Sequence, residues 1–317
     1  MNPYWVIAGI LLFLAAGIVV MICMTMPIAQ KVYEAMLVKT EPDKWLRECS
    51  APENEEQVQM WEDGCKWAEE HRAVMQEVDI VHDGLHLYGE YYDFGSKSCV
   101  MILPGRGECL KYSYYFARPY EELGMNVFVI DQRAHGKSDG RYNTIGVKEH
   151  RDVIEWIHFL EHTYGIEKLW FHGICIGSVS AILASISGEC PIIQGMVLEG
   201  AFVSFRETFK RHMQELHKPV IPVCDEVMYD LKKYADADTG KYAPIRLVDQ
   251  ITVPVLFLFG EKDVFSVPKK SAQLVDKCAS PKKKLVWFEE GGHSHLRINN
   301  TEKYDQAIID YVRGIES

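Results

Sequence analysis

The chain has 317 residues, of which 48% are hydrophobic and 25% are charged, and its formal net charge is −11 at pH 7. This composition is ordinary for a globular protein with a large core, and the length fits one α/β domain with insertions. The acidic balance, without a long basic run, excludes an electrostatic basis for nucleic-acid binding.

The N-terminus is a long uncharged segment. No charged residue occurs over positions 4–26, and positions 5–23 are almost wholly apolar. About 20 such residues in a helix span the hydrocarbon core of a bilayer. A cleaved signal peptide would need a basic start and a small-x-small cleavage site, whereas the first three residues carry no basic side chain and positions 26–29 make a poor site. The sequence therefore predicts a retained transmembrane anchor over residues 1–30.

The charges beside this anchor favour one orientation. No basic residue precedes it, and four follow it closely: Lys31, Lys39, Lys44 and Arg47. By the positive-inside rule, the large C-terminal part then lies in the cytoplasm. The nine cysteines agree with a reducing compartment, because they have no recurrent spacing and no pattern supports a disulfide such as Cys49–Cys65. They form no C-x-x-C pair, and nothing in the sequence suggests a metal or an organic cofactor.

The next two segments lead into the main domain. Residues 31–75 are charged and aromatic with a helical stretch over 55–74, and we expect this connector to pack on the main domain. Segments 78–81 and 85–88 then alternate around His82, Asp83 and Gly84, which is the turn signal of a β-hairpin.

Short continuous apolar runs follow the hairpin and alternate with amphipathic helical segments. Strands that are buried on both faces and separated by helices are typical of a parallel sheet. The predicted strands cover 99–103, 126–130, 169–172, 196–198, 254–259 and 284–288, and the predicted helices include 147–163, 176–187 and 301–314. The sequence therefore predicts an α/β domain over 76–317, with helices on both faces of a mostly parallel central sheet. Residues 202–241 interrupt this rhythm, and their length favours a short helical lid over an active site.

The most informative motif lies between a predicted strand and a predicted helix. Gly173, Cys175 and Gly177 alternate with isoleucines at this point. A Gly-x-nucleophile-x-Gly sequence between a strand and a helix is typical of a nucleophile elbow, a sharp turn that presents one side chain above the sheet. The glycines are needed because the turn is strained and the chain packs tightly beside the nucleophile. The usual central residue is serine, so the motif predicts a thiol nucleophile, Cys175.

A nucleophile of this kind needs a base and an acid that orients the base, and in such sheets the acid precedes the histidine in the chain. Asp263 directly follows the strand predicted over 254–259, and His293 follows paired glycines after the strand predicted over 284–288. We therefore expect Asp263 to orient His293. His295 stays open as an alternative base, and Glu199 stays open as an acid of a variant triad.

The chemistry that these residues predict is acyl transfer to sulfur. The Cys175 thiolate attacks an acyl carbonyl, and water then hydrolyses the resulting thioester. The developing oxyanion needs two N–H donors, which we expect to be the backbone groups of Ile176 and Arg106. The Arg106 side chain either meets an anionic group of the substrate or pairs with Glu108.

Three motifs in order carry a resemblance to a known family. Residues 104–108, 131–138 and 173–178 are similar to the family patterns HG-x-G-E, D-x-R-G-H-G-x-S and G-H-S-M-G-G. Over about residues 75–315, the chain thus resembles the α/β-hydrolase superfamily, in its serine-aminopeptidase-like (S33-type) group with monoacylglycerol lipases and lysophospholipases. The resemblance implies the α/β-hydrolase fold, with Asp263 and His293 at the acid and base positions.

The chain departs from this family at the nucleophile, where Cys175 replaces serine. Dienelactone hydrolase, another α/β hydrolase, uses a Cys-His-Asp triad, so the substitution is compatible with activity in the superfamily. We therefore expect a membrane-anchored hydrolase of esters or thioesters, of acyl-lipid type, with a small-molecule acyl substrate as its partner. Peptide bonds stay a second substrate class, and a catalytically inactive binding or scaffold protein is the alternative function.

Overall fold

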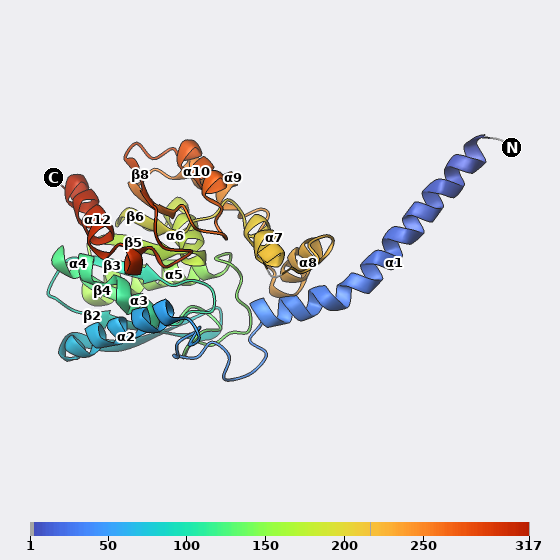
Figure 1. Ribbon diagram of the computed structural model, residues 1–317. Coiled ribbons are helices and arrows are strands. Elements are labelled where there is room, and N and C mark those ends of the chain that lie inside the picture. Colours follow the sequence, from blue (N-terminus) through green and yellow to red (C-terminus); the bar gives the residue numbers. More distant parts are fainter. Residues whose placement is uncertain (1–2, 216, 317) are drawn as a thin grey trace.

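The computed structural model describes residues 3–215 and 217–316 (Figure 1). The first two positions of the predicted anchor, position 216 of the predicted lid and the last residue of the predicted domain lie outside the described residues. The helices are α1 (Pro3–Leu37), α2 (Glu55–Glu70), α3 (Leu110–Ser113), α4 (Arg118–Glu122), α5 (Glu149–Phe159), α6 (Ile176–Ile186), α7 (Phe205–Glu215), α8 (Val223–Ala235), α9 (Pro244–Leu247), α10 (Pro268–Lys277), α11 (Leu296–Asn299) and α12 (Thr301–Glu316).

An eight-stranded sheet organises the domain, in the order β1-β2-β4-β3-β5-β6-β7-β8. The strands are β1 (Met75–His82), β2 (Leu85–Tyr92), β3 (Ser98–Leu103), β4 (Asn126–Ile130), β5 (Lys168–Ile174), β6 (Ile193–Glu199), β7 (Val255–Gly260) and β8 (Lys283–Phe288). Strand β2 is antiparallel to both of its neighbours, and the strands from β4 through β8 are all parallel. The predicted, mostly parallel sheet is therefore confirmed.

The predicted hairpin is also confirmed. Strands β1 and β2 pair from Met75 with Tyr92 to His82 with Leu85. The two residues of the turn, Asp83 and Gly84, have φ values of 53° and 73°. A two-residue turn with positive φ at both positions matches the right-handed twist of the strands that it joins.

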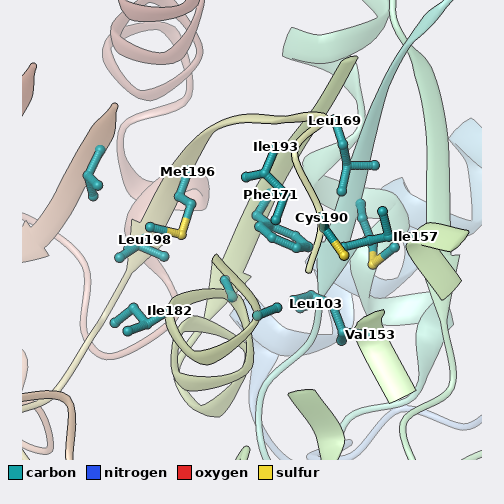
Figure 2. Packing of buried hydrophobic residues seen from close by; sticks show 14 of the residues in the cluster. Leu103, Val153, Ile157, Leu169, Phe171, Ile182, Cys190, Ile193, Met196 and Leu198 are labelled. Atoms are coloured by element: carbon teal, nitrogen blue, oxygen red, sulfur yellow. The ribbon is translucent and has the colours of Figure 1, made fainter. Parts of the chain in front are cut away.

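The core lies on both faces of the sheet, which explains why the strand sequences are continuous apolar runs. On one face, Phe171 of β5 and Met196 of β6 pack with Ile182 of α6 and with Val153 of α5 (Figure 2). On the other face, side chains of α2, α4 and α12 pack against the opposite sides of the strands, and these include Met60, Trp67, Tyr120, Ile308 and Val312. The sheet is thus sandwiched between two helical layers.

Helix α2 lies in the segment that we expected to connect the anchor to the domain. Its side chains Met60 and Trp67 are fully buried in the core on one face of the sheet. The Trp67 indole also donates a hydrogen bond of 2.7 Å to Glu121. Helix α2 is therefore part of the core of the α/β domain.

Helix α1 extends far from the domain and continues past residue 30 to Leu37 (Figure 1). Its most apolar 18-residue window is wholly exposed, and the helix is long and apolar enough to cross a membrane. Its C-terminal part is different, because Ala29, Tyr33 and Leu37 are buried in an apolar cluster that also holds side chains of α7 and α8. Beside them, the Thr25 hydroxyl donates a hydrogen bond of 2.7 Å to Glu226 of α8. The segment predicted as a lid thus holds two helices, of which α8 packs against the base of the apolar helix.

Candidate active site

Cys175 occupies the turn between β5 and α6, with φ of 53° and ψ of −112°. This conformation is strained for a residue with a Cβ atom, and strain of this kind clusters at active sites. A Cβ atom at Gly177 would lie 2.1 Å from the Leu103 carbonyl oxygen, and one at Gly173 would lie 2.7 Å from the Ser178 backbone. Both glycines are therefore required by the close packing of β5, β3 and α6 around Cys175.

We expect Gly177→Ala to destabilise the protein by about 3 kcal/mol or more, because the new methyl group must displace backbone. The matched control is Gly314→Ala, since a Cβ atom at Gly314 in α12 would meet nothing within 4 Å. That control should stabilise by about 1 kcal/mol or less, through helix propensity. Urea unfolding of the full chain in detergent, followed by tryptophan fluorescence, measures both changes. Equal unfolding midpoints for the two variants would contradict the close packing of Gly177 against Leu103.

His293 and Asp263 form a hydrogen-bonded pair at the carboxyl ends of β8 and β7. The distance from His293 Nδ1 to Asp263 Oδ2 is 2.8 Å. Asp263 Oδ1 accepts hydrogen bonds of 2.8 Å from the backbone N–H groups of Phe265 and Ser266. These two bonds fix the carboxylate, so it holds the imidazole with Nδ1 toward Asp263 and leaves Nε2 for another partner.

The electrostatics couple His293 to Cys175. Burial raises the pKa of the Cys175 thiol, but the charge and hydrogen bond of His293 and the charge of Arg106 outweigh it and hold that pKa below its ordinary value. Burial lowers the pKa of His293, but Asp263 and Cys175 outweigh it and raise that pKa well above its ordinary range. The pKa of Asp263 is lowered, since His293 and the backbone N–H groups overcome the effect of burial. A lowered thiol pKa beside a raised imidazole pKa favours a thiolate–imidazolium pair.

The structure separates the alternative base and acid from this pair. His295 Nε2 lies 2.8 Å from the Gln57 side-chain oxygen, and Nδ1 lies 3.2 Å from Glu56, so both ring nitrogens face α2. Glu199 is fully buried, accepts a short hydrogen bond from the Tyr304 hydroxyl, and accepts another of 3.4 Å from the Leu296 N–H. The residue that contacts Asp263 is therefore His293.

Two backbone N–H groups flank the nucleophile. Ile176 is the first residue of α6, where helical N–H groups have no partner within the helix. Arg106 lies in the loop after β3, in which a Cβ atom at the neighbouring Gly105 would lie 3.6 Å from the Cys175 Cβ. Neither N–H donates a hydrogen bond within the described part of the protein. Both are thus available to an oxygen atom bound beside Cys175.

A cavity of about 200 Å³ opens over Cys175 and His293. Its apolar wall comes from α7, through Phe205 and Phe209, and from Met36 at the end of α1. Tyr112 and Gln57 also line it, and neither was singled out from the sequence, because each lies in a segment whose packing is set by distant contacts.

No group of three or more His, Cys, Asp or Glu side chains placed to hold a metal ion occurs within residues 3–215 and 217–316.

Comparison with known proteins identifies the fold and a similar family. The family model described as serine aminopeptidase, S33, matches residues 95–245. Among solved structures, an esterase from Pyrococcus furiosus, Pf2001, aligns with a TM-score of 0.64 at 21% identity, over 78% of this chain and 93% of that one. The alpha/beta hydrolase domain-containing protein 10 from mouse aligns with a TM-score of 0.59 at 15% identity, over 76% and 99% of the two chains. This chain has the α/β-hydrolase fold.

Three curated proteins similar to this chain come from one bacterium and two yeasts. The chain is 24% identical over 208 residues to the uncharacterized protein YqkD of Bacillus subtilis, and 28% identical over 195 residues to protein bem46 of Schizosaccharomyces pombe. It is 26% identical over 233 residues to the uncharacterized membrane protein YNL320W of Saccharomyces cerevisiae. These matches cover 64%, 61% and 72% of this chain, and 66%, 59% and 76% of the relatives' own lengths. The resemblance to the S33-type group that its motifs indicate is confirmed.

Proposed function

We propose that this protein of α/β-hydrolase fold is a membrane-anchored thiol hydrolase that cleaves carboxylic esters or thioesters of acyl-lipid type. The observation that carries the proposal is the position of Cys175 on a strained turn, beside an imidazole that Asp263 holds at 2.8 Å. A nucleophile, a base and an orienting acid in contact are what acyl transfer through a covalent intermediate requires.

The reaction begins when the Cys175 thiolate attacks the acyl carbonyl carbon, and the carbonyl electron pair moves to oxygen. The N–H groups of Ile176 and Arg106 stabilise that oxyanion. As the oxyanion collapses, the bond to the leaving group breaks, and the His293 imidazolium gives its proton to the departing alkoxide or thiolate. A thioester on Cys175 remains, with His293 neutral.

Water completes the cycle. Neutral His293 removes a proton from a water molecule as the water oxygen attacks the thioester carbonyl. The tetrahedral intermediate then releases the Cys175 thiolate and the carboxylic acid product, which restores the thiolate–imidazolium pair. Asp263 stabilises the imidazolium in both half-reactions without taking a proton itself.

The lipid part of the proposal rests on how the apolar helix meets the cavity. Met36, near the C-terminal end of α1, lines the same cavity as the α7 side chains Phe205 and Phe209. An acyl chain in a bilayer crossed by α1 would therefore meet an apolar wall close to Cys175. Because Lys31, Lys39 and Lys44 follow the apolar segment, we further propose that the domain faces the cytoplasm.

The pH dependence of thiol alkylation tests the proposal. Because the pKa of Cys175 is lowered, its thiolate persists at pH values below the ordinary thiol pKa of about 8.5. We expect iodoacetamide to alkylate Cys175 of the full chain in detergent rapidly between about pH 6 and 8, and turnover of acyl esters to fall in parallel. Mass spectrometry locates the alkylated residue, and Cys65, whose pKa is raised by burial, serves as the internal control. Slow alkylation at an ordinary thiol pKa, without turnover of any ester or thioester, would instead support a binding or scaffold protein.

A further inference from the structure

We propose that the cavity selects acyl substrates that carry an anionic group, a carboxylate or a phosphate, and that the Arg106 guanidinium binds this group. The inference rests on the proposed thiol hydrolase function and names the substrate class of the same site. Arg106 follows Gly105, at which a Cβ atom would lie 3.6 Å from the Cys175 Cβ, and Arg106 and Cys175 line the same cavity.

The Arg106 guanidinium is charged and has few hydrogen-bond partners. An arginine side chain has five N–H donors in a planar fork and stays protonated in proteins. Arg106 uses one of these donors, in a bond of 3.4 Å from Nη1 to the Met36 carbonyl oxygen. Within the described part of the chain, that is its one side-chain hydrogen bond, and it takes part in no ion pair. Most of the donor capacity of a half-buried cation is therefore unused.

Glu108, the acidic side chain that lines the cavity, forms no ion pair with Arg106 within the described residues. Glu108 Oε1 accepts hydrogen bonds of 2.6 Å from Ser50 and 3.0 Å from Gln57, so it is held on the side of α2 and the connector. Burial raises the pKa of Glu108 to about 7, which leaves much of it protonated near neutral pH. The pairing of Arg106 with Glu108 that we considered from the sequence is thus not formed, and the guanidinium donates to Met36 instead.

The charge of Arg106 acts on titratable groups on two sides of the cavity. The positive charge of Arg106 helps to lower the pKa of Cys175 and, after burial, that of His212 on α7. Cys175 and His212 both line the cavity, on the nucleophile side and the α7 side. With its lowered pKa, His212 is neutral at pH 7 and adds no second cation. The His293 imidazolium is already paired with Asp263 and Cys175, so Arg106 is the cavity cation that has free donors. Such a cation in a partly desolvated cavity is suited to one oxyanionic group of a ligand.

One other role would account for the same position. Arg106 could serve only to stabilise the Cys175 thiolate and the oxyanion of the intermediate, in which case it would help neutral and anionic substrates equally. The two roles predict different substrate ratios. If the guanidinium binds an anion of the substrate, then of two substrates with the same shape, only the anionic one gains in kcat/KM.

The test compares two matched pairs of substrates with the full chain in detergent. In the first pair the anion is on the acyl side: p-nitrophenyl hemisuccinate against p-nitrophenyl 4-methylpentanoate, which has the same shape without charge. In the second pair the anion is on the leaving group: monodecanoylglycerol phosphate against monodecanoylglycerol. We expect kcat/KM to favour the anionic member of at least one pair, and the pair that does so identifies where the anion lies. In R106M this preference should fall by about 10- to 100-fold, and R106K should retain part of it. R313M, which removes an exposed arginine of α12, should keep the wild-type ratio.

Binding to the Cys175→Ala protein separates this inference from the proposed function, because it needs no turnover. Tighter binding of the anionic ester, lost in the Cys175→Ala, Arg106→Met double variant, would support the inference even if the wild-type protein hydrolysed neither ester. Turnover with the same substrate ratio in wild type and R106M would overturn it while leaving the hydrolase intact. An equal loss on both members of a pair, with a raised alkylation pKa of Cys175, would overturn it in favour of thiolate stabilisation.

Discussion

Replacing Cys175 with alanine should abolish ester and thioester turnover, with a loss in kcat of about 10⁴-fold or more. The methyl group of alanine cannot form a covalent bond to the acyl group, and the two N–H groups beside it cannot by themselves supply a nucleophile. The backbone at this position has φ of 53°, and strain of this kind clusters at active sites, as the proposed role of Cys175 requires. Steady-state kinetics of the full chain in detergent, on p-nitrophenyl esters and acyl thioesters, measures the loss.

Two further variants keep this result interpretable. Cys175→Ser keeps a nucleophilic atom but replaces a thiol with a hydroxyl that does not ionise in this pH range, so its kcat should fall well below that of the wild type. Cys65→Ala removes a half-buried thiol outside the cavity and should leave kcat within about twofold. If Cys175→Ala retained wild-type turnover, the covalent mechanism would be wrong whatever the fold.

His293→Ala should lower kcat by about 10³-fold or more, and His295→Ala by much less. His293 contacts Asp263 at 2.8 Å and lowers the pKa of Cys175, whereas His295 contacts Gln57 and Glu56 of α2. Loss of His293 removes the positive charge that stabilises the thiolate. The pKa of Cys175, read from the pH profile of its alkylation, should then rise toward the ordinary thiol value. Less thiolate is present at neutral pH as a result, and alkylation there is slower.

The paired histidines provide an internal control for this prediction. Both line the cavity and lie two residues apart, so a difference between the variants reports the contact to Asp263 rather than general damage to the loop. The measurements are kcat and the pH profile of Cys175 alkylation in each variant. A His295→Ala variant with the greater loss and the greater shift in alkylation would reassign the base.

The sequence predicted most of the fold because each buried strand is a continuous apolar run bounded by a turn signal. Strand β4 (Asn126–Ile130) begins and ends where the run does, and α6 (Ile176–Ile186) begins directly after Cys175, as the elbow motif requires. The Asp83–Gly84 turn was predictable because few residues other than glycine, asparagine and aspartate adopt positive φ in a two-residue hairpin. These are local rules, and they hold wherever no distant contact competes with them.

The walls of the cavity depend on distant contacts and could not be predicted in the same way. Met36 belongs to an apolar helix that composition marks as an anchor, and nothing local indicates that its last turn reaches the cavity. The choice between His293 and His295 was likewise open, because residues two apart in a loop can point either way. In the structure His293 contacts Asp263 and His295 contacts α2, and Ser294 between them has φ of 62°.

The most direct measurement is the mass of the enzyme trapped during turnover. The full chain is mixed with a p-nitrophenyl ester, quenched in acid within the first turnovers, digested and analysed by mass spectrometry. We expect the mass of one acyl group as a hydroxylamine-sensitive thioester on the peptide that holds Cys175, and none in the Cys175→Ala protein. Rapid release of carboxylic acid with Cys175 unmodified at every quench time, or with the acyl group on another residue, would contradict the mechanism.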